Sequence, residues 1–184
     1  MKAVFTGGSR SVSRLNSDIR ARLDNIIEKG LQVYVGDANG ADKAIQSYLH
    51  ERNYRHVLVF CMEGECRNNV GAWPLRAISP PHQKHDFGYF TAKDAAMAKE
   101  SECGLMLWDG KSAGTMLNAA RLIAEAKPVV LYVSPRKSFE TVRTRSEFAT
   151  LLAQTIPEAR RRIHEYLTEY ILEFAEPSIF DSAA

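Results

Sequence analysis

The sequence has few cysteines, no long hydrophobic run and no excess of charge of one sign. Its three cysteines, Cys61, Cys66 and Cys103, lack the spacing of a redox pair or a zinc site, so we expect free thiols. No stretch approaches the ~18 apolar residues of a membrane-spanning helix. The first residues also lack the apolar segment of a secretion signal. These absences predict a cytoplasmic protein without a membrane partner.

The charge of the chain is nearly balanced. The 24 Lys and Arg residues stand against 22 Asp and Glu residues, which gives a formal net charge of +2. Nucleic acid is therefore not an expected partner, because binding to its phosphate backbone needs a concentrated basic face. The five histidines lack the spacing of a metal site, and we expect neither a metal nor a cofactor. An anionic ligand has to be held by a few local groups.

Apolar runs and helical stretches alternate along the first three quarters of the 184 residues, which is the length of one domain. This alternation indicates parallel strands joined by helices. We expect an α/β fold of the Rossmann-like, doubly wound type, with a mainly parallel five-stranded sheet and helices on both faces. The strand order is expected to be 3-2-1-4-5. The expected strands are 2–6, 31–35, 56–61, 103–108 and 129–133, and the expected helices are about 15–27, 41–50, 91–100 and 114–126.

Two segments fall outside this alternation. Residues 62–85 carry several Gly and Pro residues without periodicity, and a stretch of that length predicts a functional lid or disorder. Within it, Arg67 suits a phosphate, whereas Trp73 is expected to fold onto the core. Residues 1–135 are expected to form the nucleotide-binding domain and 136–184 a C-terminal helical extension. The apolar stripe of this extension packs on the same domain or on a second subunit, so a homo-oligomer stays an alternative.

Glycine-rich segments follow three of the expected strands. Ligands of open α/β sheets bind beyond the carboxyl ends of the strands, where the strand order reverses. Glycine lets backbone N–H groups approach an anion, and a helix N-terminus adds positive partial charge, so phosphate is the expected guest. The alternative is that these residues only form turns and helix starts. The predicted ligand-binding residues are Thr6, Gly7, Gly8, Ser9, Arg10, Gly36, Asp37, Gly40, Ala41, Asp42, Arg67, Asp109, Gly110, Ser112, Gly114 and Thr115.

Ionisable side chains are expected at the same edge. Carboxylates beside a phosphate accept hydrogen bonds from ribose hydroxyls, and a close pair can perform acid–base chemistry. Lys93, Asp94 and Asp109 are the candidates for catalysis. Asp42 is equally well explained as a helix cap, and both interpretations stay open. Neither a GxGxxG fingerprint nor a P-loop is present in the sequence.

The combination of TGGSR, GDANGAD, KDAAMA and WDGKSAGT resembles the SLOG superfamily. This Rossmann-like group contains the LONELY GUY phosphoribohydrolases, DprA and the YspA-like proteins. The resemblance covers residues 1–135 and is closest to the YspA-like branch, whose GAD turn and DGxSxGT loop are matched at 40–42 and 109–115. It implies a protein that binds a nucleotide or nucleotide-derived small molecule, as a ligand-binding or sensor protein. The alternatives are an N-glycosidase acting on nucleoside 5′-monophosphates and DprA-like nucleic-acid binding.

Residues that the LONELY GUY enzymes use for catalysis are replaced in this sequence. Lys93 stands where those enzymes have an arginine, and it offers a point charge without a bidentate fork. Trp108, Asp109 and Gly110 replace the PGG of their PGGxGTxxE segment. Asn118 stands at the position of its essential glutamate. The resemblance therefore implies ligand binding ahead of phosphoribohydrolase activity.

Overall fold

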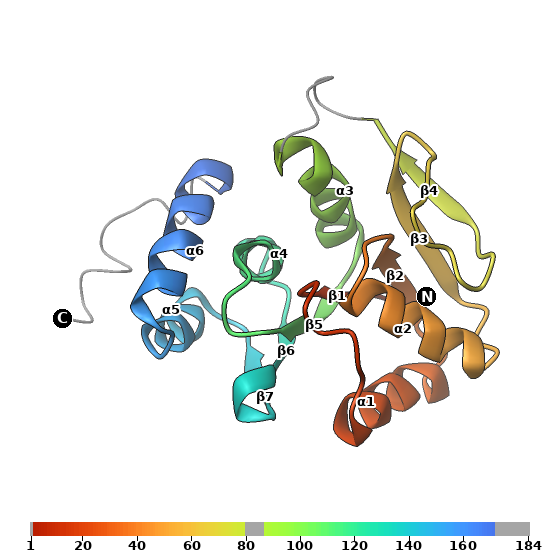
Figure 1. Cartoon of the computed structure of the whole chain (residues 1–184), viewed down its shortest axis with the longest axis horizontal. Coiled ribbons are helices and arrows are strands. Elements are labelled where there is room, and N and C mark those ends of the chain that lie inside the picture. The colour runs from red at the N-terminus through yellow and green to blue at the C-terminus, as the bar shows by residue number, and fades with distance from the viewer. Residues whose placement is uncertain (1, 80–86, 172–184) are drawn as a thin grey trace.

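The computed structural model describes residues 2–79 and 87–171 of the chain. In this part of the chain, seven strands form one sheet in the order β4-β3-β2-β1-β5-β6-β7 (Figure 1). The strands are β1 Ala3–Gly8, β2 Gln32–Gly36, β3 Val57–Met62, β4 Leu75–Ile78, β5 Cys103–Trp108, β6 Val129–Val133 and β7 Ser138–Val142. The helices are α1 Ser17–Glu28, α2 Ala41–Glu51, α3 Phe87–Glu100, α4 Ala113–Ala124, α5 Arg145–Ala153 and α6 Pro157–Tyr170, with a short 3-10 helix, η1, at Ser134–Arg136.

The α/β fold with a mainly parallel sheet is confirmed, and so is the predicted order of the central strands. Strands β3, β2, β1, β5 and β6 are neighbours in parallel pairs, and β1 registers with β5 from Val4 opposite Cys103 to Gly8 opposite Leu107. The chain adds strands to one side of β1 and then crosses to the other side. The strand order therefore reverses between β1 and β5.

The prediction of five strands is wrong, because each edge of the sheet carries one further strand. β4 lies in the segment 62–85 that was expected to be a lid or disordered, and it pairs in parallel with β3. It is four residues long and mostly exposed, so it lacks the apolar run that marks a buried strand. β7 lies in the segment expected to be helical and pairs antiparallel with β6, with Val133 opposite Ser138. The remainder of the loop, 80–85, lies outside the described residues.

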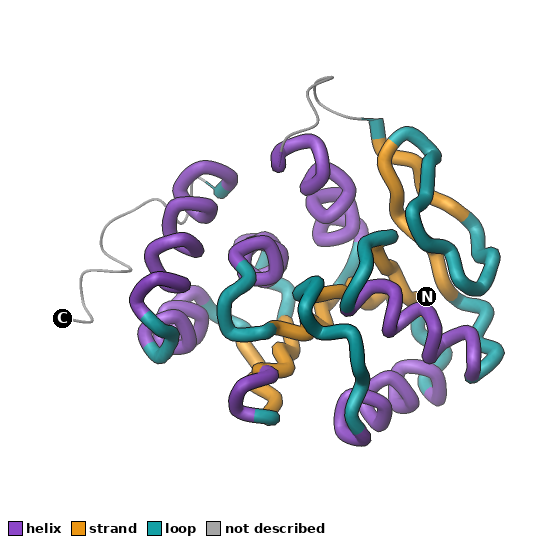
Figure 2. Tube along the Cα trace, in the orientation of Figure 1, coloured by secondary structure: helices purple, strands orange, loops and turns teal. Residues whose placement is uncertain are grey.

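Helices cover both faces of the sheet, as Figure 2 shows. α1 and α2 share one buried apolar cluster with alternate residues of β1, β2 and β3. α3 and α4 share a second cluster with residues of β5 and β6 on the opposite face. Right-handed crossovers that run outward from β1 in opposite directions place their helices on opposite faces. The loops after β1 and β5, where the strand order reverses, thus lie between two layers of helices. We call this place the switch point.

The C-terminal elements extend the second layer. Ile163 and Leu167 of α6 are fully buried and belong to the same apolar cluster as Met116 and Ala120 of α4. α5 begins with a capping box between Thr144 and Glu147. Residues 172–184 of the expected extension lie outside the described residues. None of the described helices is long and apolar enough to cross a bilayer.

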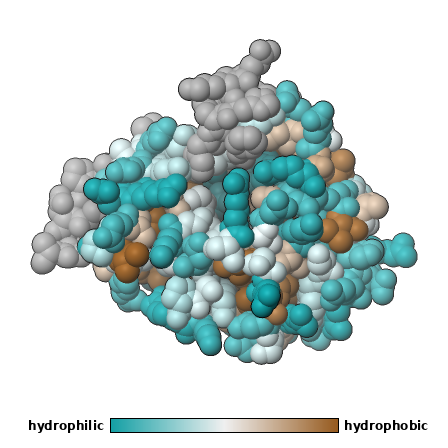
Figure 3. Space-filling model, in the orientation of Figure 1, coloured by the Kyte–Doolittle hydropathy of each residue, from teal (hydrophilic) through white to brown (hydrophobic). Residues whose placement is uncertain are grey.

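Side chains on the face drawn in Figure 3 are mostly hydrophilic, and the apolar ones form small separate spots. Among the described residues, the large apolar side chains that are exposed are Val70, Leu75 and Ile156. Trp73 is buried as predicted, and its indole N–H donates to the carbonyl of Tyr54 at 2.9 Å. A ligand site therefore has to be sought at the strand ends, where polar groups converge.

Candidate functional site

The loops that follow β1 and β5 are joined at the switch point. The Ser9 N–H donates to the carbonyl of Leu107 at 2.8 Å, and the Ser9 hydroxyl lies 3.1 Å from that of Thr115. The same hydroxyl accepts the Asp109 N–H at 3.1 Å. Gly8 is required here, because a Cβ would overlap the carbonyl oxygen of Leu107. Two of the three predicted glycine-rich segments therefore form one surface.

A cavity of about 540 Å³ opens beside these loops, and it is of the size that takes a small-molecule ligand. Its walls come from the loops after β1 and β5 and from α2, α3, α4 and α6. Many of the predicted site residues line it: Gly7, Gly8, Arg10, Asp42, Arg67, Lys93, Asp94, Asp109, Ser112, Gly114 and Thr115. The structure thus brings residues from distant parts of the sequence to the edge where the sequence predicts a ligand.

Other predicted site residues do not line the cavity but pack behind the residues that do. These are Thr6, Ser9, Gly36, Asp37, Gly40, Ala41 and Gly110, which are not part of its lining. Thr6 is fully buried and donates to the carbonyl of Tyr34 at 3.2 Å. The Ala41 N–H donates to the carbonyl of Ser9 at 3.3 Å. A Cβ on Gly40, where φ is +85°, would overlap the backbone of Arg10, so these residues hold the loop after β1 against α2.

Asp37 and Arg67 form an ion pair at one wall. The Arg67 guanidinium donates to the two Asp37 carboxylate oxygens at 2.6 and 3.1 Å, and the Arg67 N–H adds a third bond at 3.1 Å. Burial alone would raise the pKa of Asp37, but the bonds from Arg67 and the charge of Lys93 lower it below its usual value. Arg67 therefore reaches the cavity with its fork already engaged by a protein carboxylate.

Lys93 is buried among carboxylates. Its Nζ lies 2.8 Å from Asp94 Oδ1 and 3.7 Å from Asp37 Oδ1, with only 5% of the side chain exposed. Burial lowers the pKa of this ammonium, but Asp94, Asp42 and Asp37 more than offset that effect, so the pKa lies above its usual value. Asp94 also accepts the Asn118 side-chain N–H at 3.2 Å. The positive charge of Lys93 therefore offsets the negative charges of Asp37, Asp42 and Asp94, of which Asp42 and Asp94 form what we call the floor of the cavity.

Asp42 lies between the ends of β1 and β2. Its Oδ2 accepts the Ala38 N–H at 3.2 Å, and a Cβ on Gly36 would overlap that oxygen. Burial raises its pKa, Lys93 lowers it, and Asp94 raises it again, with the net result of about 6. The bond from Ala38 joins the carboxylate to the loop before α2, although Asp42 stands in the first turn of that helix. Its carboxyl group thus lines the cavity and changes charge near neutral pH.

Some N–H groups of the loop after β5 donate to side chains of the same loop. Asp109 accepts the Lys111 and Ser112 N–H groups at 2.9 and 2.7 Å, and the Ser11 hydroxyl at 2.6 Å. Ser112 caps α4 by accepting the Thr115 N–H at 3.3 Å. The N–H groups of Ala113 and Gly114, the first two residues of α4, have no acceptor within the helix. A bound anion can therefore use these two amides, whereas the amides of Lys111 and Ser112 already bond Asp109.

Three cations of the cavity have no carboxylate partner in the part of the chain that the structure describes. Within the described residues, no Asp or Glu lies at ion-pair distance from Arg10, Lys111 or Arg162, although each lines the cavity. The carboxylates that share the lining are held by internal donors. Arg10 and Lys111 stand on the loops after β1 and β5, beside the open amides of α4. The resulting charge balance favours an anionic guest.

Several lining residues were missed by the sequence analysis. Phe5 and Met97 line the cavity, but their apolar side chains are typical of core residues. Lys111 was not predicted, although Gly110 and Ser112 on either side of it were. Arg162 and Tyr166 come from α6, about fifty residues beyond the last predicted site residue. Their four-residue spacing places them on one helix face, but only the packing of α6 on α4 brings that face to the cavity.

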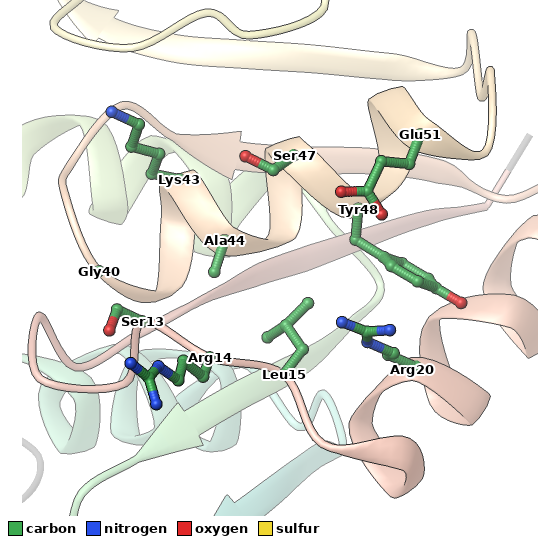
Figure 4. Close-up of a pocket in the computed structure, with 10 residues that line it drawn as sticks. All are labelled: Ser13, Arg14, Leu15, Arg20, Gly40, Lys43, Ala44, Ser47, Tyr48 and Glu51. Atoms are coloured by element: carbon green, nitrogen blue, oxygen red, sulfur yellow. The ribbon is translucent and has the colours of Figure 1, made fainter.

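A second cavity, of about 520 Å³, lies between α2 and the segment that leads into α1 (Figure 4). Arg14, Arg20 and Lys43 line it, and the guanidinium of Arg20 lies 5.6 Å from the centre of the Tyr48 ring. This cavity includes none of the buried acids described above, and Gly40 is the one predicted site residue in its lining. The described residues contain no group of three or more His, Cys, Asp or Glu side chains that could hold a metal ion.

No protein-family model matches the sequence, and the comparison with curated proteins finds no match either.

Proposed function

We propose that this protein binds a nucleotide or a nucleotide-derived small molecule in the cavity at the switch point, as a ligand-binding or sensor protein. The observation that carries the proposal is the set of unpaired cations around the open amides of α4. Arg10 and Lys111 face the same cavity as the N–H groups of Ala113 and Gly114. A phosphate group gains both from cationic side chains and from the N-terminus of a helix.

The acids of the cavity suit the remainder of such a ligand. Asp42 and Asp94 lie on the floor, where a carboxylate accepts hydrogen bonds from ribose hydroxyls. Phe5 and Met97 add apolar surface. The resemblance of the loops after β1, β2 and β5 to those of the SLOG superfamily supports the same ligand class. The polar and apolar parts together fit an amphiphilic ligand better than inorganic phosphate.

A thermal-shift screen tests the proposal. The panel contains nucleoside mono- and diphosphates, cyclic nucleotides, nucleotide sugars, ADP-ribose and inorganic phosphate. A ligand at a hundred times its dissociation constant stabilises the folded state by ~2.7 kcal/mol. We expect Lys111→Ala to reduce this stabilisation, and Lys43→Ala, at the cavity of Figure 4, to leave it unchanged. The absence of any shift across the panel would overturn the proposal.

A second candidate function is hydrolysis of the N-glycosidic bond of a nucleoside 5′-monophosphate. The observation that favours it is the pKa of about 6 at the buried Asp42, since a carboxyl group that titrates near neutral pH suits acid–base catalysis. Water would add to C1′ of the ribose while the C1′–N bond breaks and the base leaves with a proton. The ionised carboxylate would also stabilise the positive charge that develops on the sugar.

The two candidate functions differ in whether the bound nucleotide is cleaved. Incubation with nucleoside 5′-monophosphates, followed by chromatography, shows free base and ribose 5-phosphate if the bond is cleaved. Asp42→Asn should then abolish release while binding of the nucleotide persists. Binding of intact nucleotide without any release after long incubation would leave the ligand-binding function alone.

A further inference from the structure

The C-terminal helix α6 is anchored so that one flank of it forms a wall of the cavity. Ala159, Ile163 and Leu167 are buried and pack it against α4. Arg162 and Tyr166 lie one helical turn apart on the same side of this buried stripe, and both line the cavity. The segment that the superfamily resemblance does not cover thus contributes directly to the ligand site.

Arg162 and Tyr166 form a stacked pair, because the Arg162 guanidinium lies over the Tyr166 ring at 5.9 Å from its centre. The centre of the Tyr166 ring also lies 6.1 Å from that of the Tyr170 ring. Tyr166 is partly buried against the α4 cluster, which limits the movement of its ring. Among the described residues, Arg162 has no carboxylate partner that would compete for it. Tyrosine rings and guanidinium planes are both common stacking surfaces for nucleobases.

The rest of the cavity fixes which end of the ligand meets this pair. The open amides and the unpaired cations Arg10 and Lys111 belong to the loops after β1 and β5 and hold the phosphate. The acids Asp42 and Asp94 lie on the floor and suit the ribose. α6 therefore faces the part of the ligand that is neither phosphate nor ribose.

We propose that α6 is the base-recognition element of the site, with the Tyr166 ring and the Arg162 guanidinium together forming the surface on which the nucleobase stacks. This inference rests on the proposed nucleotide-binding function and adds an orientation to it. The base points away from the strand ends and toward the C-terminal extension. It also makes Arg162 and Tyr166 specificity-determining residues in a segment that the sequence assigned to packing.

Calorimetric titration with two kinds of ligand tests the proposal. AMP and GMP carry a base, whereas ribose 5-phosphate carries the same phosphate and sugar without one. We expect Tyr166→Ala to weaken binding of AMP and GMP about 5- to 100-fold, the effect of losing one stacked base, and to leave ribose 5-phosphate unchanged. Tyr166→Phe keeps the ring and should retain most of the affinity.

The neighbouring arginine provides a matched control. Arg161→Ala removes the same charge from the same helix, but Arg161 does not line the cavity and pairs with Glu165 at 3.9 Å. Arg162→Ala should weaken binding of the nucleotides while Arg161→Ala should not. Ribose 5-phosphate binding reports whether each variant still folds its phosphate site.

The outcomes separate the two proposals. If neither ribose 5-phosphate nor any ligand of the thermal-shift panel binds the unaltered protein, the proposed function fails. If nucleotides bind but Tyr166→Ala leaves their affinity unchanged, or weakens ribose 5-phosphate equally, the base-recognition role of α6 is overturned. Selective loss of nucleotide affinity, with retention in Tyr166→Phe, supports it.

Discussion

The hydroxyl of Ser9 lies 3.1 Å from the hydroxyl of Thr115 and links the loop after β1 to the first turn of α4. Thr115 donates in turn to the Ser112 side chain at 3.0 Å, so the Ser9 hydroxyl is the donor of the first bond. Ser9 also accepts the Asp109 N–H and is almost completely buried. One small side chain therefore sets the spacing between the two loops that carry the cations of the cavity.

Ser9→Ala should destabilise the protein by ~1–3 kcal/mol. The substitution leaves the Asp109 N–H without its acceptor and removes the bond that the Thr115 hydroxyl accepts, and the cost of an unsatisfied buried group is of that size. Urea unfolding measures the change in free energy. Ser13→Ala, at an exposed position of the same loop, should change stability by less than ~0.5 kcal/mol. Equal effects of the two substitutions would show that the bonds of Ser9 do not hold the loops.

Arg67→Ala should cost ~2–3 kcal/mol of stability at pH 7. It removes the main partner of the buried Asp37 carboxylate. The expected cost is smaller than that for a fully buried ion pair, because the Arg67 side chain is partly exposed to solvent. Because the pKa of Asp37 is lowered in the folded state, the ion pair stabilises above the unfolded pKa of 3.8 and is lost as pH falls through the folded pKa. The cost should therefore shrink in acid.

A surface pair provides the control for that variant. Arg76 is 53% exposed and pairs with Glu100 at 3.2 Å, so Arg76→Ala should cost less than ~1 kcal/mol. Urea unfolding of both variants between pH 3 and pH 7 is the measurement. A cost for Arg67→Ala that does not vary with pH would contradict the role assigned to Asp37.

The central sheet could be predicted from the sequence because its strands are buried on both faces. Val33 and Val35 of β2, like Leu105 and Leu107 of β5, belong to short apolar runs that end in glycine or a polar turn. The edge strands gave no such signal. β4 is exposed and short, and β7 is specified by its pairing with β6 rather than by its own composition.

The candidate site could be predicted only where it follows strand ends. The positions of Gly8, Asp42 and Gly114 follow from the rule that ligands meet the carboxyl edge at the switch point. The internal use of the Asp109 carboxylate depends on side-chain geometry, which the sequence does not specify. The contribution of Arg162 depends on the docking of α6, a long-range contact without a local pattern.

Lys93→Met should raise the pKa of Asp42 above about 6. The ammonium of Lys93 is the main group that opposes the effect of burial on Asp42. The variant should also lose ~3–5 kcal/mol of stability at pH 7, because Asp37, Asp42 and Asp94 remain without their shared cation. Carbon-13 NMR titration of the Asp42 carboxyl gives the pKa. Lys99→Met, on the exposed side of α3, should change neither quantity, and an unchanged Asp42 pKa in Lys93→Met would contradict the coupling.

Asp42→Asn should become more stable relative to the unaltered protein as pH rises. The folded-state pKa of Asp42, about 6, lies above the value of 3.8 for the free side chain, so the folded state binds the proton more tightly. Ionisation therefore destabilises the fold progressively between these two values, by ~2–3 kcal/mol at pH 7. Asparagine stays neutral and avoids that cost. Urea unfolding of both proteins from pH 4 to pH 8 should show a difference that grows up to about pH 7 and then levels. A difference between Asp42→Asn and the unaltered protein that stays constant over this pH range would exclude the raised pKa.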